Sequence, residues 1–117
     1  MSNAAQVWDI VRVGFPLVDT NTVRVRPGLV IATPSATDTF GIVWVLMITS
    51  ARHQRWPDDI VISDLSSTGL PHPSVIRTGK IAAIDSRVAA PVGRLTEADR
   101  EAVRQRLKQH FGPALAV

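Results

Sequence analysis

The feature that most constrains the fold is an apolar run over residues 40–50, with the sequence FGIVWVLMITS. The run is rich in β-branched and aromatic residues, and its length suits a long strand. It is too short to cross a membrane, which takes about 20 apolar residues. Side chains alternate along a strand, so Val43, Val45 and Met47 face one side and Trp44, Leu46 and Ile48 face the other. Both faces are apolar. We therefore expect this strand to be covered on both sides, in a small barrel or sandwich, or against a helix or a second subunit.

Shorter apolar segments around this run predict further strands. They cover residues 7–13, 26–32, 60–62, 74–78, 81–84 and 88–95. Residues 14–16 contain Gly and Pro and are expected to end the first strand, and residues 19–22 and 63–73 are expected to form loops. Between the segments 74–78 and 81–84, Gly79 and Lys80 predict a bend or a bulge.

One helix is predicted near the C-terminal end. Thr96 followed by acidic residues is a typical helix start, and Gly112 with Pro113 is expected to end the helix. Its apolar stripe consists of Val103, Leu107 and Phe111. Strands do not alternate with helices, which argues against a doubly wound sheet. We therefore expect a single domain over residues 1–117 that is mainly β (α+β): a small, strongly bent antiparallel barrel with a C-terminal α-helix.

Composition narrows the class of protein and its partners. The chain contains no cysteine, which excludes disulfides and thiolate-ligated metal sites. Arginine supplies eleven of the thirteen basic residues, and the formal net charge is +3. Arginine is suited to bidentate recognition of phosphate, so a nucleic acid is favoured over a membrane surface. The first residues have neither the basic nor the apolar region of a secretion signal, and we expect a cytoplasmic protein.

Most familiar catalytic motifs are missing from the sequence. There is no glycine-rich nucleotide-binding motif and no HExxH metal motif, and the histidines are scattered, so we expect neither a cofactor nor a metal. The carboxylates lie in predicted turns or at the predicted helix start, which argues against a hydrolase with paired carboxylates. No serine lies in a nucleophile elbow. The side chains that remain as candidates for catalysis are arginines and hydroxyls. They suffice for metal-free RNA cleavage, because RNA supplies its own nucleophile, the 2′-hydroxyl, and the protein orients the chain, stabilises charge and moves protons.

Seven short segments stand in an order and spacing that resembles the PemK/MazF family of toxins. They are DIV at 9–11, FP at 15–16, RPGLV at 26–30, MITS at 47–50, GLP at 69–71 with SVIR at 74–77, IAAID at 81–85 and GRL at 93–95. The resemblance extends from residue 7 to about residue 112. It implies an SH3-like barrel, a homodimer, inhibition by a small cognate antitoxin, and metal-independent, sequence-selective cleavage of single-stranded RNA.

The resemblance also implies roles for particular residues. Arg26 matches the arginine that stabilises the phosphorane or supplies a proton, and Thr49 matches the hydroxyl that holds the scissile phosphate. Arg77 aligns with an arginine that some members use in catalysis. Two residues later the pattern departs, because Gly79 stands where those members have an acid–base aspartate. His53 is our candidate for the missing base, since it follows the central strand and imidazole titrates near neutral pH.

Further residues are predicted to contact RNA. They are Arg24, Ser50, Arg52, Arg55, Trp56 and Lys80. Several of the assignments have structural alternatives. Thr49 and Ser50 are also ordinary residues for a strand. Arg26 could instead form a salt bridge with an aspartate such as Asp19. Trp56 could stack on an unpaired base, or pack against the turn or a dimer interface. His72 stands between two prolines, and we interpret it as loop scaffolding.

Two other functions stay open at the level of sequence. Gly79 in place of the acid is compatible with a non-catalytic toxin of the same fold that inhibits a protein target such as DNA topoisomerase. A structural or RNA-binding barrel without either activity is the third hypothesis.

Overall fold

A computed structural model describes residues 4–16, 23–34 and 41–116 of the chain. Its elements within these ranges are β1 (Asp9–Pro16), β2 (Val23–Ala32), β3 (Ile42–Ser50), β4 (Asp59–Val61), β5 (Ser74–Asp85), the short 3₁₀ helix η1 (Ser86–Val88), β6 (Ala89–Arg94) and α1 (Glu97–Leu115). The predicted loop at residues 19–22 lies outside the described residues.

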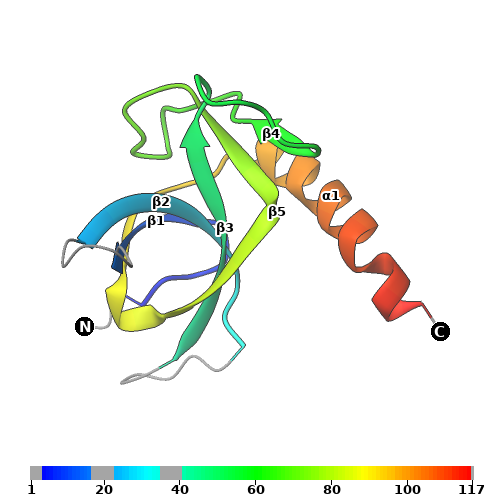
Figure 1. Ribbon diagram of the computed structural model, residues 1–117, viewed down its shortest axis with the longest axis horizontal. Helices are drawn as coiled ribbons and strands as arrows, with labels where there is room; N and C mark the ends of the chain where they lie inside the picture. The colour runs from blue at the N-terminus through cyan, green and yellow to red at the C-terminus, as the bar shows by residue number, and fades with distance from the viewer. Residues whose placement is uncertain (1–3, 17–22, 35–40, 117) are drawn as a thin grey trace.

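The strands form one antiparallel sheet in the order β4-β5-β3-β2-β1-β6. The sheet curls strongly, and α1 lies against its outer side (Figure 1). A mainly β fold with a C-terminal helix is therefore confirmed. The sheet is not closed by hydrogen bonds, however, because β4 and β6 each pair with only one neighbour among the described strands. The molecule is a bent open sheet with the shape of a barrel.

Strand β3 lies between β5 and β2 near the centre of the sheet. As predicted, its alternating side chains enter two separate cores. Val43, Val45 and Met47 belong to the core inside the curled sheet. Leu46 and Ile48 belong to a second core on the outer side, which also contains Val103 of α1. Trp44 is the exception on this outer face, because 39% of its surface is exposed.

The predicted bulge at Gly79 and Lys80 is present, but it lies within one continuous strand instead of separating two. In the β3–β5 pairing, Met47 is opposite Arg77 whereas its neighbour Leu46 is opposite Ile81. The residues from 78 to 80 therefore have no partner in β3, and β5 bends sharply there (Figure 1). Because of this bend, one long strand follows the curl of the sheet and pairs with β3 on both sides of the bulge.

Three predicted strand boundaries in β1 and β2 are wrong. β1 begins at Asp9, because Trp8 has a positive φ of 77°, and it continues to Pro16 instead of ending before Gly14. β2 begins at Val23, three residues earlier than predicted. The reason is cross-strand pairing, which extends as far as Pro16 opposite Val23 and outweighs the local turn preference of glycine and proline.

Helix α1 begins after Thr96, as predicted, and Asp99 in its first turn is buried. The Asp99 carboxylate accepts hydrogen bonds from the Ser63 amide at 3.0 Å and the Ser63 hydroxyl at 2.7 Å, which fasten the helix start to the loop at residues 63–73. The predicted end at Gly112 is wrong. The helix continues through Pro113 to Leu115, because Ala116 N–H donates to the Gly112 carbonyl and closes the last turn.

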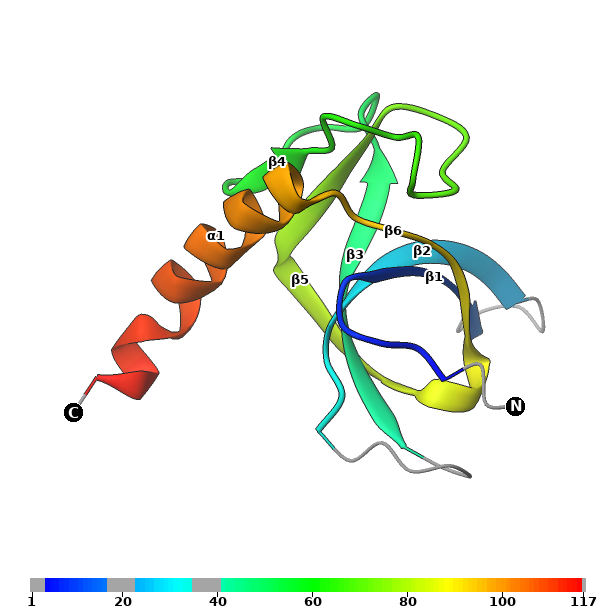
Figure 2. The same ribbon diagram turned by 180° about the vertical axis from the view of Figure 1, so that it is seen from behind.

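The C-terminal end of the helix extends away from the sheet (Figure 2), but His110 still contacts it, because its Nε2 lies 3.0 Å from Thr78 Oγ1 of β5. Val103 is fully buried and Leu107 packs against the outer core, while Phe111 of the predicted stripe is 38% exposed. Among the described residues, no helix has the length and apolar character needed to span a membrane.

Candidate functional site

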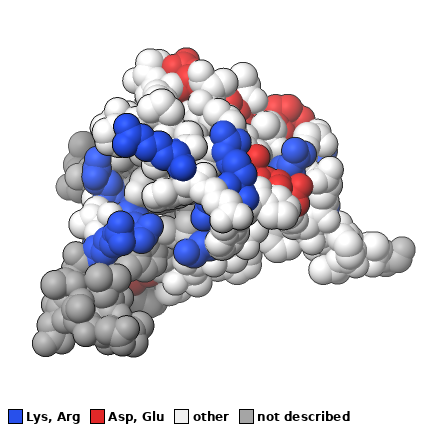
Figure 3. All heavy atoms as spheres, turned by 45° about the horizontal axis from the view of Figure 1, so that its top comes forward, with Lys and Arg blue, Asp and Glu red and all other residues white. Residues whose placement is uncertain are grey.

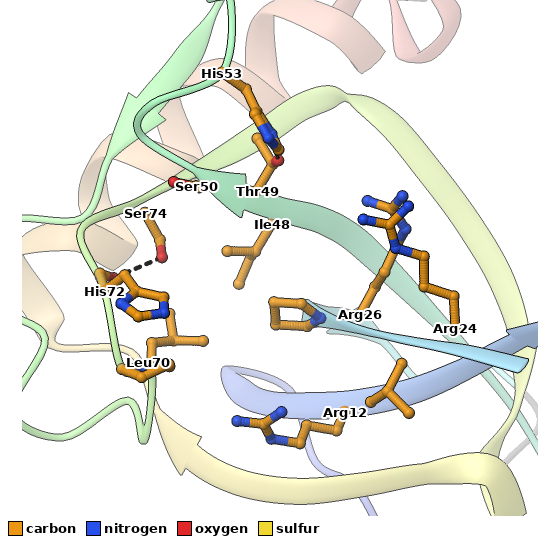
Figure 4. Close-up of a pocket in the computed structure, with 13 residues that line it drawn as sticks. Arg12, Arg24, Arg26, Ile48, Thr49, Ser50, His53, Leu70, His72 and Ser74 are labelled. Carbon is orange, nitrogen blue, oxygen red and sulfur yellow. Dashed lines mark hydrogen bonds between the residues drawn. The ribbon is translucent and has the colours of Figure 1, made fainter.

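A pocket of about 200 Å³ opens where β2 and β3 meet the loops that follow β3 and β4. Strands β1 and β2 contribute Arg12, Arg24 and Arg26, strand β3 contributes Ile48, Thr49 and Ser50, and the loops contribute His53, Leu70 and His72. Figure 4 shows these side chains arranged around Ile48. The pocket thus combines an apolar centre with a rim of cationic, hydroxyl and imidazole groups.

Sheet register brings Arg26 and Thr49 to the same pocket. Gly28 is paired with Met47 in the antiparallel β2–β3 ladder. Extending this register by two residues places Arg26 opposite Thr49, on the same face of the sheet because side chains alternate with a period of two. Arg26 is half-buried, so its guanidinium is partly shielded from water. Residues far apart in the sequence therefore meet in one site.

His53 contacts Thr49 directly. The distance between His53 Nδ1 and Thr49 Oγ1 is 2.6 Å, which is a short hydrogen bond. The turn after β3 holds the histidine in place: His53 N–H donates to the Ser50 carbonyl at 3.1 Å, and Arg52 N–H donates to Ser50 Oγ at 3.2 Å. The spacing of four residues between Thr49 and His53 is thus spanned by a tight turn, and the imidazole is fixed beside the hydroxyl.

The electrostatic character of the pocket is positive. Three guanidinium groups line it, and none of the described lining residues carries a carboxylate. Figure 3 shows basic side chains gathered on one face of the molecule, with acidic side chains next to some of them. Guanidinium groups bind phosphate through paired charge-assisted hydrogen bonds. The pocket is therefore suited to a phosphate with an uncharged or apolar group beside it.

Two neighbouring cavities share residues with this pocket. One is lined by Ser50, Ala51, Arg52, His72 and Pro73. The other is lined by Arg26, Met47, Lys80, Ile81 and Ala82. Of the predicted site residues, Arg24, Arg26, Thr49, Ser50 and His53 therefore meet in the pocket, and Arg52 and Lys80 lie in the adjoining cavities. The pocket shares Ser50 and His72 with the first of these cavities and Arg26 with the second.

Arg77 is placed elsewhere and lines none of these three cavities. Its Nε is 3.5 Å from Asp59 Oδ2, its guanidinium lies 4.4 Å from the centre of the Trp56 ring, and it donates to the Gln54 carbonyl. Only 12% of its side-chain surface is exposed. In this position Arg77 supports the loop at residues 51–58, and its catalytic role stays a prediction.

Trp56 takes part in the same cluster. Its backbone N–H donates to Asp59 Oδ2 at 2.9 Å, and Lys80 Nζ lies 5.9 Å from the ring centre. These contacts agree with the alternative in which Trp56 packs the turn, although 42% of its surface remains exposed. Arg55 is exposed on the same loop. The aspartate suggested as an alternative partner for Arg26, Asp19, lies outside the described residues.

Sequence reasoning missed two pocket residues, Arg12 and His72. Arg12 was not singled out within the predicted first strand, and His72 was interpreted as loop scaffolding. Their positions depend on pairing and loop packing: Arg12 is opposite Pro27 in the β1–β2 ladder, and His72 sits on the loop that folds over the ends of the strands. The signal available in the sequence for His72 was its confinement between Pro71 and Pro73.

Metal ligation has little support in the described part of the chain. No group of three or more His, Asp or Glu side chains there could hold an ion.

Comparison with known proteins adds a family and a fold. A family model for PemK-like, MazF-like toxins of type II toxin–antitoxin systems matches residues 6–111. No curated protein sequence matches the chain significantly.

Three solved structures from Deinococcus radiodurans are similar in fold. A MazE–MazF complex (Form-II) has a TM-score of 0.70 at 18% identity and covers 95% of this chain and 98% of its own. A second MazE–MazF complex (Form-III) has a TM-score of 0.67 at 19% identity, with coverages of 93% and 97%. MazF alone (Form-I) has a TM-score of 0.67 at 17% identity, with coverages of 95% and 99%.

Proposed function

Because the chain belongs to the PemK-like, MazF-like toxins of type II toxin–antitoxin systems, we propose that it is an endoribonuclease that cleaves single-stranded mRNA selectively and without a metal ion. The observation that carries the proposal is the meeting of Arg26 with the hydrogen-bonded pair of Thr49 and His53 in one positively charged pocket. A guanidinium, a hydroxyl and an imidazole are the groups that metal-free cleavage of RNA requires.

The reaction begins with attack of the RNA 2′-oxygen on the adjacent phosphorus. The Thr49 hydroxyl donates to a non-bridging phosphate oxygen and orients the phosphate. The Arg26 guanidinium lies where negative charge develops on the phosphorane, and a preformed cation there lowers the barrier more than it stabilises the ground state. His53 accepts the proton of the 2′-hydroxyl. The products are a 2′,3′-cyclic phosphate and a free 5′-hydroxyl.

The residues around this centre bind the flanking nucleotides. Arg12 and Arg24 contact phosphates at the pocket rim, and Ser50 contributes a further hydroxyl. Arg52 and Lys80 lie in the two adjoining cavities, on either side of the scissile phosphate. Single-stranded RNA is favoured over duplex because the pocket takes one phosphate beside apolar side chains of Val25 and Leu70, which a splayed base can cover.

The partners follow from the family. Two of the similar solved structures are complexes of MazE with MazF, and we propose a small cognate antitoxin for this chain as well. Carboxylates of such a partner would compete with RNA phosphates for the pocket arginines. We also propose that the protein acts as a homodimer in the cytoplasm.

The test is incubation of the purified protein with RNAs of varied sequence in excess EDTA. We expect cleavage that leaves a cyclic phosphate, because no step uses a metal. Arg26→Ala and Thr49→Val should each slow cleavage by roughly 10²–10³-fold, the usual effect of removing a group that stabilises the transition state. Lys108→Ala, a charge lost from the exposed face of α1, is the matched control and should cleave normally.

Intact RNA across all sequences, with a folded protein, would overturn the proposal. If the same preparation blocked DNA topoisomerase, the non-catalytic toxin would be the better hypothesis.

A further inference from the structure

The pocket holds two histidines, His53 and His72, which come from separate loops. Figure 4 shows their rings reaching the pocket from different sides, with Ile48 in its centre. We infer that they form an acid–base pair for RNA cleavage, in which His53 is the general base and His72 is the general acid. This inference rests on the proposed function and goes beyond it by naming the group that protonates the leaving oxygen.

The chemistry of the lining residues points to this pair. Cleavage needs one group to remove the 2′-hydroxyl proton and another to protonate the 5′-oxygen as it leaves. The charged residues that line the pocket are Arg12, Arg24 and Arg26, and a guanidinium does not give up its proton in a protein. Hydroxyl groups are poor proton donors and acceptors near neutral pH. Among the described lining residues, only the two imidazoles exchange protons readily there.

The hydrogen bond to Thr49 assigns His53 as the base. If Nδ1–H donates to Thr49 Oγ1, the opposite nitrogen, Nε2, keeps a free lone pair for the 2′-hydroxyl proton. Nδ1–H still donates after Nε2 is protonated, so the same hydrogen bond holds the ring in both protonation states. The Thr49 hydroxyl remains free to donate to the phosphate. The pair therefore positions the base and the phosphate together.

His72 is held as a second, independent group. Pro71 and Pro73 restrict the backbone on both sides of it, and its carbonyl accepts a hydrogen bond of 2.8 Å from the hydroxyl of Ser74, a buried residue. Its ring has no hydrogen-bond partner among the described residues, so the ring is available to a substrate. The loop thus presents a free imidazole on a stiff backbone.

The position of His72 also matches that of an acid for the leaving group. With Ser50, it lines both the pocket and the neighbouring cavity that contains Arg52. A leaving nucleoside would occupy that cavity while the cyclic phosphate forms in the pocket. The charged groups facing the two rings are Arg12, Arg24 and Arg26 in the pocket and Arg52 in the second cavity. An entering phosphate would bring negative charge to these cations.

The step balances without a further reactant. His53 Nε2 takes the proton of the 2′-hydroxyl while the bond from the 2′-oxygen to phosphorus forms. The bond from phosphorus to the 5′-oxygen breaks, and the imidazolium of His72 gives its proton to that oxygen. One proton has moved from the 2′-oxygen to His53 and one from His72 to the 5′-oxygen, and exchange with water restores both histidines.

Two single variants and two substrates test the pair. The cleavage site is first mapped with the wild-type protein, and an RNA is then made in which sulfur replaces the bridging 5′-oxygen at that site. A thiolate leaves without being protonated, so this substrate does not need a general acid. We expect His72→Gln to slow cleavage of the oxygen substrate by about 10²–10⁴-fold and to cleave the sulfur substrate within about 10-fold of the wild-type rate. His53→Gln should be slow on both substrates.

Further readouts separate catalysis from folding and from binding. Both histidines are exposed, so both variants should keep the wild-type unfolding midpoint and the affinity for a 2′-deoxy oligonucleotide. The wild-type rate should rise and then fall with pH; His53→Gln should lose the rising limb and His72→Gln the falling limb.

If the wild-type protein cleaves RNA but His72→Gln is as fast as the wild type, or is not rescued by sulfur, the inference is overturned. If the wild-type protein cleaves no RNA, the proposed function itself fails and the inference fails with it.

Discussion

At the scale of single residues, the clearest contrast is between the pocket arginines and Arg77. Arg26 is half-buried and lines the pocket, whereas Arg77 is packed between the Asp59 carboxylate and the Trp56 ring. The side chain of Asp59 is only 2% exposed, and its Oδ1 has no hydrogen-bond partner within the part of the chain that the structure describes. Removing the cation beside a nearly buried carboxylate strongly destabilises the folded protein. The surroundings of Arg77 are thus those of a residue that stabilises the fold.

We therefore expect Arg77→Ala to lower the free energy of unfolding by about 3 kcal/mol, because the nearly buried Asp59 carboxylate would lose the cation beside it. Urea unfolding followed by tryptophan fluorescence measures this change. Arg55→Ala, an exposed arginine in the same loop, is the control and should change stability by less than about 0.5 kcal/mol. An Arg77→Ala protein that unfolds like the wild type but no longer cleaves RNA would show instead that Arg77 acts in catalysis.

At the scale of elements, the loop at residues 63–73 links the outer core to the pocket. Asp99 of α1 fastens one end of it through Ser63. In its middle, the Ser67 carbonyl accepts a hydrogen bond of 2.8 Å from the Arg94 amide of β6. The far end of the loop carries Leu70 and His72 into the pocket. The helix and β6 therefore hold in place the loop that carries these two residues into the pocket.

Two glycine substitutions test this arrangement. A Cβ on Gly93 of β6 would lie 2.3 Å from the backbone carbonyl carbon and oxygen of Thr68, so the loop would have to move. A Cβ on Gly79, at the bulge of β5, would meet nothing within 4 Å. We expect Gly93→Ala to cost about 2 kcal/mol or more in unfolding free energy and to slow RNA cleavage, while Gly79→Ala stays near the wild type in both. Equal stability of the two variants in thermal unfolding would contradict the tight contact between β6 and the loop.

At the scale of the whole molecule, the charges are distributed unevenly. Several arginines away from the pocket are paired: Arg94 with Asp9 at 2.6 Å, and Arg104 with Glu97 at 2.7 Å. The hydrogen bond from Arg104 lowers the pKa of Glu97, which keeps that carboxylate ionised. The pocket arginines Arg12, Arg24 and Arg26, in contrast, have no acidic partner among the described residues. A modest formal net charge of +3 thus yields a concentrated positive surface at one site.

RNA binding should accordingly depend on salt. Each phosphate neutralised on a single strand contributes about −0.7 to the slope of log K against log salt concentration, so contacts from three pocket arginines predict a slope of about −2. Titration of a non-cleavable 2′-deoxy oligonucleotide by fluorescence anisotropy at several salt concentrations measures it. Arg12→Ala should reduce the steepness by about 0.7, and Lys108→Ala should leave it unchanged. A slope near zero for the wild-type protein would rule out phosphate contacts as the main source of affinity.

Much of the fold could be predicted from the sequence because it depends on neighbouring residues. The alternation along β3 determined its two apolar faces, the residues after Thr96 determined the helix start, and Gly79 with Lys80 marked the bulge of β5. The predictions that failed were boundaries, such as the continuation of β1 to Pro16 and of α1 past Gly112. At these points cross-strand pairing and a hydrogen bond in the last turn outweighed the local preferences of glycine and proline.

The residues of the candidate site, too, could be predicted only in part from the sequence. The order of short motifs singled out Arg26 and Thr49, and the place of an imidazole just after the central strand made His53 a candidate. Only the tertiary structure decided that Arg12 and His72 join them and that Arg77 does not. The reason is physical: local sequence determines which way a side chain points from its own strand, but the distance between residues of different strands and loops depends on register and packing, which involve the whole chain.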